Sequence, residues 1–163
     1  MGKILIIDKD VAFLEAFGLL LNALNLPFEV VSTHSNATRI FRTDTVDLVF
    51  LNPELPMVDP KALLDEFEGI SADKRETSTP VIFLYTDMEI IHRYELTSQP
   101  NSQLLEKPVP ITQLYEILDQ RGLTQIRIEV ESQRAQEKIS HFAQFIEQSE
   151  SWLERLRDHL VKS

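Results

Sequence analysis

The stretch that decides the fold is Val46-Asp47-Leu48-Val49-Phe50-Leu51-Asn52-Pro53-Glu54-Leu55-Pro56-Met57. Five of the six residues from Val46 to Leu51 are apolar, and two prolines follow them. This pattern predicts a short strand that is buried on both faces, as in a parallel sheet covered by helices. Asn52 stands where the strand ends. Because ligands of open α/β sheets bind at the carboxyl ends of the strands, we expect a functional site around Asn52.

Length and composition limit the possible classes of protein. A chain of 163 residues, 43% of them hydrophobic, is long enough for one domain and an appendage. No run of about 18 apolar residues occurs, so we expect no membrane span, and the apolar start is too short for a signal peptide. The absence of cysteine excludes disulfides, thiol catalysis and thiolate metal sites. We expect a cytoplasmic protein.

The charge argues against nucleic-acid binding. The formal charge is −10, and it is shared unevenly: residues 1–122 hold 10 Lys and Arg against 19 Asp and Glu, whereas residues 123–163 hold 6 against 7. Neither part has the basic face that binding to a phosphate backbone requires. The four histidines follow no metal-ligand spacing, and there is no glycine-rich phosphate loop. We therefore expect no metal, no cofactor and no nucleic-acid partner.

Strands and helices alternate five times along the chain. Apolar runs predict strands at residues 3–7, 28–31, 46–51, 80–85 and 104–106. Helical periodicity predicts helices at 11–24, 35–41, 61–68 and 110–121. A further helix is expected to begin at a cap formed by Thr86-Asp87 and to end near Leu96. The polar residues 71–79 predict a loop. Such alternation predicts an α/β fold, with a five-stranded parallel sheet that is doubly wound.

At this point residues 2–121 resemble a known family, the receiver domain of bacterial two-component response regulators. The most specific matches are Ile4-Leu5-Ile6-Ile7-Asp8, Asp47-Leu48-Val49-Phe50-Leu51-Asn52 with Leu55-Pro56-Met57, and Leu105-Glu106-Lys107-Pro108. The resemblance implies the flavodoxin-like receiver fold. It also implies a phosphorylation site at the end of the third strand.

The acidic pocket of that site departs from the family pattern. Asp8 fits the first acidic position, but Lys9 occupies the second, with Asp10 one residue later. Asn52 occupies the position of the phospho-accepting aspartate, and Glu54 is a possible neighbour of the pocket. An amide oxygen is a poor nucleophile, and Mg²⁺ prefers carboxylate ligands. The resemblance therefore points to a naturally degenerate pseudo-receiver.

The switch positions are retained in part. Tyr85, followed by Thr86, stands where the family has the hydroxyl residue that contacts the phosphoryl group. Leu104 occupies the position where many receivers have an aromatic residue that changes rotamer on activation. Lys107 and Pro108 match the family, and the resemblance implies a cis peptide bond between them.

We predict that ion pairs close this pocket, with Asp8–Lys9 and Asp8–Lys107 contacts and a lysine ammonium where Mg²⁺ would lie. Opposite charges within about 4–6 Å need no divalent ion to balance them. The alternative is that the Lys9 side chain points into solvent, as most lysine side chains do.

Residues 123–163 lie outside the resemblance and favour a long helix, because they lack Pro and Gly and are rich in Glu, Gln, Arg and Lys. The alternation of Ile126-Arg127-Ile128-Glu129-Val130 leaves the conformation of residues 123–131 open. Apolar residues recur at heptad spacing, which predicts a coiled coil or bundle. The predicted oligomerisation residues are Ile139, Phe142, Ile146, Trp152, Leu153, Leu156 and Leu160. Packing of this helix back onto the receiver part is the alternative.

The expected domains are a receiver-like part, residues 1–122, and the helical tail, residues 123–163. The expected function is signal transduction by protein–protein contact, without enzymatic activity or phosphorylation, in a homodimer joined by the tail. Two alternatives stay open. One is a phosphorelay receiver that uses another acceptor, such as Asp8 or Asp10. The other is the input half of a longer regulator with an enzymatic or DNA-binding output.

Overall fold

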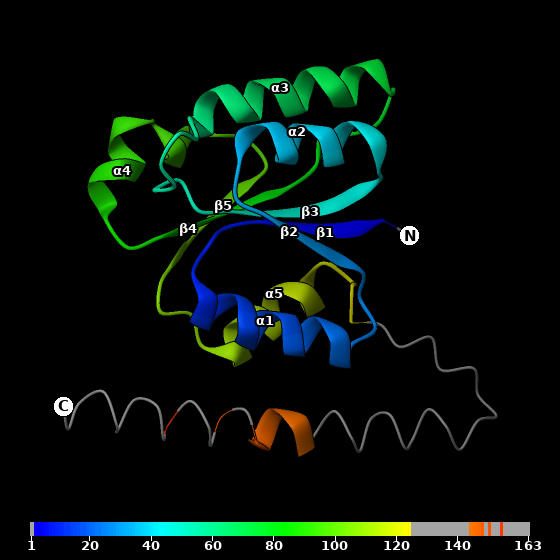
Figure 1. Ribbon diagram of the computed structural model, residues 1–163, viewed down its shortest axis with the longest axis vertical. Helices are drawn as coiled ribbons and strands as arrows, with labels where there is room; N and C mark the ends of the chain where they lie inside the picture. The colour runs from blue at the N-terminus through cyan, green and yellow to red at the C-terminus, as the bar shows by residue number, and fades with distance from the viewer. Residues whose placement is uncertain (1, 125–143, 149, 151–153, 155–163) are drawn as a thin grey trace. The chain divides into compact units, whose positions relative to one another are not determined.

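The structure, a computed structural model, describes residues 2–124, 144–148, 150 and 154. Its strands are β1 (Lys3–Ile7), β2 (Phe28–Val31), β3 (Val46–Leu51), β4 (Val81–Tyr85) and β5 (Ser102–Glu106). Its helices are α1 (Val11–Ala23), α2 (His34–Thr43), α3 (Pro60–Asp73), α4 (Met88–Arg93) and α5 (Ile111–Gln120), with a 3-10 turn, η1, at Leu96–Ser98. The strands form one sheet in the order β2-β1-β3-β4-β5, and all neighbours are parallel (Figure 1). The predicted α/β fold with a doubly wound, five-stranded parallel sheet is confirmed.

The register of the central strands determines where the site lies. Ile7 of β1 pairs with Leu51 of β3, so Asp8 and Asn52 both follow the last paired residues. The Asn52 N–H extends the ladder and donates to the Ile7 carbonyl at 2.9 Å. The strand order reverses between β1 and β3, and ligand sites of open α/β sheets lie at such a switch point. Asp8 and Asn52 therefore emerge together where a site is expected.

The sheet is buried as the apolar run in β3 predicted. Leu48, Val49, Phe50 and Leu51 have no exposed surface, and each large apolar side chain buried in this way contributes about 1.5–3 kcal/mol. Helices α2 and α3 lie together on one side of the sheet (Figure 1). They pack through the rings of Phe41 and Phe67, whose centroids lie 4.1 Å apart with 19° between the ring planes.

The chain divides into two compact units, residues 1–14 with 27–108 and residues 15–26 with 109–163. The first unit holds the whole sheet and helices α2 to α4. The second unit holds α5 and most of α1. Its buried side chains include Phe17, Leu20 and Leu21 from α1, and Leu114 and Leu118 from α5. The domain boundary after residue 122 stays a prediction.

Several predicted element boundaries are wrong, and three of them have a clear physical reason. Helix α3 continues to Asp73 through the start of the predicted loop, because Ile70 and Ser71 lie on its buried side. Helix α4 ends at Arg93 rather than near Leu96, since Glu95 adopts a left-handed φ of 54° that breaks the helix. Strand β5 begins at Ser102, which pairs with the start of β4.

The tail predictions fall largely outside the described residues. Residues 144–148, 150 and 154 are helical, and Ile146 among them is half-buried. The other predicted oligomerisation residues lie outside the described part: Ile139, Phe142, Trp152, Leu153, Leu156 and Leu160. Within the described part, no helix has the length and the apolar character that crossing a bilayer would need.

Candidate functional site

Asp8 is the buried charge at the centre of the candidate site. Its side chain has no exposed surface, and both carboxylate oxygens accept hydrogen bonds. Oδ1 accepts from the backbone N–H of Lys9 at 2.7 Å, from that of Asp10 at 3.2 Å and from the Asn52 amide at 3.0 Å. Oδ2 accepts from the Lys107 ammonium at 2.6 Å. Both oxygens of this carboxylate are therefore paired with protein donors, as burial of a charge requires.

Lys107 supplies the charge that balances Asp8. Its side chain is 7% exposed, and its Nζ also lies 3.1 Å from Asp10 Oδ2 and 5.0 Å from the centre of the Phe13 ring. Burial acts to raise the pKa of Asp10, but the hydrogen bonds from Lys107 and from the Phe13 N–H hold that pKa below its ordinary value. One ammonium thus bridges two carboxylates over an aromatic face.

Asn52 joins the carboxyl ends of β1 and β3 through both atoms of its amide. Its Nδ2 donates to Asp8 at 3.0 Å, and its Oδ1 accepts from the Glu54 N–H at 2.9 Å. A carboxylate at this position could accept from Glu54 but could not donate to Asp8. The amide is therefore the group that these two neighbours require in this arrangement.

Glu54 forms a clamp that holds the loop between β4 and α4. Its carboxylate accepts from the Thr86 N–H at 2.8 Å, from the Thr86 hydroxyl at 2.8 Å and from the Asp87 N–H at 3.2 Å. No sequence pattern indicated this contact, because it joins residues more than 30 positions apart. Hydrogen bonds to an ionised acceptor are about twice as strong as neutral ones. The clamp fixes the β4–α4 loop without any bound group.

Two predicted members of the pocket lie elsewhere. The Lys9 side chain is exposed, and among the described residues it forms no ion pair, so the predicted Asp8–Lys9 contact is wrong. The backbone N–H of Lys9, rather than its ammonium, donates to the Asp8 carboxylate. Glu54 binds the β4–α4 loop rather than Asp8. The predicted Asp8–Lys107 contact is present.

The switch positions separate into two groups. Thr86 is bound by Glu54 in the clamp, whereas Lys107 belongs to the site through Asp8. Tyr85 and Leu104 are partly buried and pack against the apolar core. The peptide bond before Pro108 is cis, as the resemblance implied.

The groups around Asp8 do not fit Mg²⁺, which requires several hard oxygen ligands in near-octahedral geometry. Asp8 already pairs with an ammonium, and the Asn52 amide presents its NH₂ rather than its oxygen to the same carboxylate. Within the described ranges, no three or more Asp, Glu or His side chains are placed to hold a metal ion. Positive charge in this site comes from Lys107.

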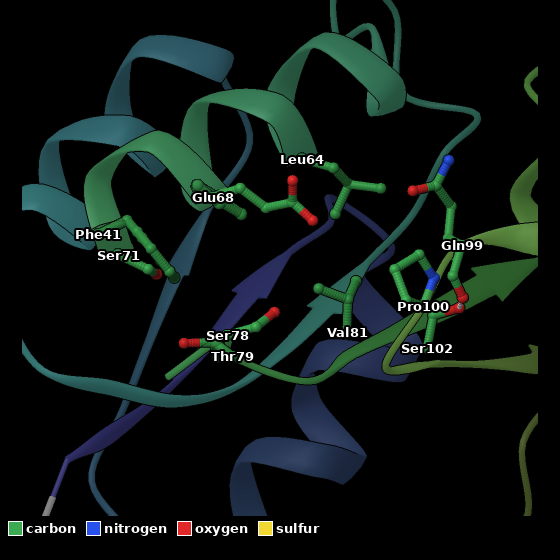
Figure 2. Close-up of a pocket in the computed structure, with 11 residues that line it drawn as sticks. Phe41, Leu64, Glu68, Ser71, Ser78, Thr79, Val81, Gln99, Pro100 and Ser102 are labelled. Atoms are coloured by element: carbon green, nitrogen blue, oxygen red, sulfur yellow. Dashed lines mark hydrogen bonds between the residues drawn. The ribbon is translucent and has the colours of Figure 1, made fainter. Parts of the chain in front are cut away.

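A small cavity lies away from this site, between α3 and the strands β4 and β5 (Figure 2). Leu64 reaches toward Val81 across it, with Gln99 and Pro100 at the rim. Its volume of about 20 Å³ has room for roughly one water molecule. It is too small to bind an organic ligand.

Comparison with known proteins identifies the fold. No family model and no curated protein matches the sequence. Among solved structures, a receiver domain from Methylobacillus flagellatus matches with a TM-score of 0.61 and 22% identity, over 74% of this chain and 98% of that chain. The receiver domain of a sensor histidine kinase from Pseudomonas aeruginosa, with magnesium in its active-site cleft, matches with a TM-score of 0.59 and 19% identity, over 74% and 98% of the two chains. The chain has the receiver fold.

A third similar structure has a different description. It is a fusion that carries a trimeric coiled coil of yeast Spc42, with a TM-score of 0.58 and 18% identity, over 98% of this chain and 96% of that chain. These identities establish a shared fold. The chemistry of the site must therefore be argued from the residues of this chain.

Proposed function

We propose that the chain is a response-regulator-like signalling module that acts by protein–protein contact without phosphorylation of an aspartate. The observation that carries the proposal is the Asn52 amide, which lies at the end of β3 and donates to Asp8. Phosphoryl transfer to a side chain needs a nucleophilic oxygen, and an amide oxygen is a poor one. In this arrangement Asn52 is a structural link between two strands.

The closed ionic site supports the same proposal. Lys107 lies 2.6 Å from the buried Asp8 carboxylate, so the charge of Asp8 is already balanced without a divalent ion. The Glu54 clamp holds the β4–α4 loop through Thr86 and Asp87 with no added phosphoryl group. We infer one resting conformation of this edge of the sheet.

We further propose that the module is non-enzymatic and cytoplasmic, and that it forms a homodimer through residues 123–163. The heptad stripe in the tail supports this, since an exposed apolar stripe on a helix is stabilised by burial against another chain. The similarity to the fusion with a trimeric coiled coil, which spans 98% of this chain, also supports self-association.

The test of phosphorylation is treatment of the full-length protein with acetyl phosphate and Mg²⁺, followed by measurement of its intact mass. We expect no phosphoryl adduct. The matched control is the double variant Lys9→Asp with Asn52→Asp, which restores both missing carboxylates and should accept a phosphoryl group. A hydroxylamine-labile adduct on the unmodified chain would refute the proposal and would favour Asp8 or Asp10 as the acceptor.

The test of self-association is sedimentation of the full-length protein and of the double variant Ile146→Ala with Leu153→Ala. We expect a dimer that dissociates at micromolar concentration in the variant, because large apolar side chains in a packed seam lose about 2–5 kcal/mol on truncation to Ala. Gln144→Ala with Gln148→Ala, at exposed positions of the same helical segment, is the control and should leave the dimer intact. A full-length monomer at all concentrations would contradict the dimer.

A further inference from the structure

The Asp8 carboxylate binds an amine and an amide at the same time. Its Oδ2 accepts from the Lys107 ammonium at 2.6 Å, and its Oδ1 accepts from the Asn52 amide nitrogen at 3.0 Å. Lys107 follows β5 and Asn52 follows β3, so the two groups come from strands that β4 separates in the sheet. A lysine amine is a nucleophile toward carbonyl carbons when a base beside it removes its proton. The contacts of Asp8 therefore bring a nucleophile and an acyl group to one proton carrier.

The Asn52 carbonyl is held by a donor at the atom where negative charge would develop. The Glu54 N–H donates to Asn52 Oδ1 at 2.9 Å. Attack on an amide carbon moves charge onto its oxygen, and a fixed backbone N–H directed at that oxygen stabilises the transition state. The carboxylate of Asp8 is negatively charged and resists attack by an electron pair. The electrophile of this site is therefore the Cγ of Asn52 rather than the carboxyl carbon of Asp8.

Burial favours the proton transfer that a lysine nucleophile needs. The side chains of Lys107 and Asp8 are 7% and 0% exposed, and the centre of the Phe13 ring lies 5.0 Å from the lysine Nζ. Removal of water penalises both charges of an ion pair, so transfer of a proton from the ammonium to the carboxylate costs less here than in water. Asp10, the second carboxylate at this Nζ, is 42% exposed and keeps its hydration. Transfer to Asp8 leaves a neutral amine beside the Asn52 amide.

We propose that Lys107 and Asn52 form an amide cross-link between the ends of β5 and β3, with Asp8 as the catalytic acid and base. Asp8 takes a proton from the ammonium, and the lysine Nζ then forms a bond to the Asn52 Cγ. Asp8 gives its proton to Nδ2 and takes another from Nζ, the Cγ–Nδ2 bond breaks, and ammonia leaves. The products are a secondary amide, ammonia and a neutral Asp8 carboxyl, so the reaction consumes no oxidant or cofactor.

The cross-link goes beyond the proposed function, because it gives the amide at position 52 a chemical role. A carboxylate at this position would be ionised and would resist the amine. The structure describes the site before the reaction, with the Lys107 ammonium hydrogen-bonded to Asp8. The reaction joins two strands that are not neighbours in the sheet and closes the chain between them into a covalent loop.

The test is the intact mass of the full-length protein, compared with the mass that its sequence requires. The folded protein is measured as purified and after prolonged incubation at mildly alkaline pH, and we expect the loss of one molecule of ammonia. Trypsin should then release a branched peptide that joins residues 43–61 to residues 94–121, because the bond after Lys107 precedes proline and is not cut. The same protein in urea should keep its mass, since only the fold holds the reacting groups together.

Two arginine variants separate the reaction from the ion pairs. Lys107→Arg keeps a positive charge beside Asp8, but a guanidinium does not give up its proton, so this variant should lose no ammonia. Lys3→Arg is the matched control, because Lys3 also lies between two carboxylates, at 2.6 Å and 2.9 Å. It should react as the parent does. Circular dichroism of each variant checks that the fold is retained.

Three outcomes would overturn the proposal. The first is a parent protein that keeps its full mass while its circular dichroism stays native. The second is a loss of water instead of ammonia, which would place the link on Asp8. The third is an equal loss of ammonia from Lys107→Arg. No phosphate donor is present in these measurements, so this inference and the proposed function can fail separately.

Discussion

The two edges of the sheet use the same device, one lysine between two carboxylates. At the carboxyl edge, Lys107 contacts Asp8 at 2.6 Å and Asp10 at 3.1 Å. At the amino edge, Lys3 contacts Asp44 at 2.6 Å and Glu29 at 2.9 Å. The distances are nearly equal, and burial is the main difference. The side chains of Lys107 and Asp8 are 7% and 0% exposed, whereas that of Lys3 is 27% exposed.

That difference in burial decides what each ion pair contributes. A charge at the amino edge keeps much of its hydration when its partner is removed, and exposed pairs contribute little. Asp8 at the carboxyl edge has no solvent to replace Lys107, so the loss of the lysine leaves a buried charge without compensation. The comparison shows that the contact between Lys107 and Asp8 is maintained because the buried Asp8 carboxylate must be neutralised.

The largest effect is expected from removal of the buried cation. Lys107→Met keeps the apolar stem over Phe13 but leaves Asp8 unpaired, so it should lower the free energy of unfolding by about 3–5 kcal/mol. Urea denaturation at neutral pH measures this. If Lys107→Met lowers the free energy of unfolding no more than Lys3→Met does, burial does not distinguish the two ion pairs.

The next effect is expected from Asn52→Asp. This variant replaces the amide donor to Asp8 with a second carboxylate at the same position. Loss of a hydrogen bond to a charged group should cost about 1.5–3 kcal/mol at neutral pH, and the deficit should shrink in acid as one of the two carboxyls takes up a proton. The matched control, Asn101→Asp, also loses an amide hydrogen bond but has a backbone carbonyl as its partner. Equal losses at both positions would show that repulsion from Asp8 contributes nothing.

A smaller effect is expected at the amino edge, and it depends on alkaline pH. Hydrogen bonds to Asp44 and then to Glu29 raise the pKa of Lys3 above its ordinary value of 10.5. A raised lysine pKa means that the stabilisation is complete below that value and is lost as the pH rises through the pKa of the folded protein. Lys3→Met should therefore be less stable than the parent at neutral pH, and the gap should narrow in strong alkali. Parallel stability curves would contradict this.

The smallest effect is expected from Asp10 in acid. Its pKa is lowered, so its contribution to stability is present above its ordinary value of 3.8 and is lost as the pH falls through the pKa of the folded protein. Asp10→Asn keeps a side-chain oxygen to cap α1 but carries no charge. Denaturation of both proteins between about pH 5 and about pH 2 should show the difference between them shrinking as the pH falls. The size should be modest, because the Asp10 side chain is 42% exposed.

The fold and one half of the site could be predicted from the sequence. The apolar run from Val46 to Leu51 has the composition of a doubly buried strand, which is a local pattern. The Asp8–Lys107 contact was predicted from the resemblance to the receiver family, which implied that both residues belong to one pocket. A local pattern also encoded the end of α5, where Gly122 adopts a φ of 71°.

The other half of the site depends on side-chain direction, which spacing does not encode. Lys9 is exposed and contacts Asp8 through its backbone N–H, and Glu54 turns toward Thr86 because that loop offers it two N–H donors and a hydroxyl. Helix α4 ended early because Glu95 adopts a left-handed conformation that its residue type does not favour. These outcomes are determined by contacts between distant segments of the chain.

The amide of Asn52 also constrains how this lineage can change. Codons for asparagine and aspartate differ by one base, so a return to an acidic residue is within reach of a single mutation. That step would place two carboxylates together before any compensating change at position 9, and the expected loss of stability acts against it. The site is therefore easier to inherit than to reverse. Related chains that keep an asparagine here should also keep the carboxylate of Asp8 and the lysine of position 107.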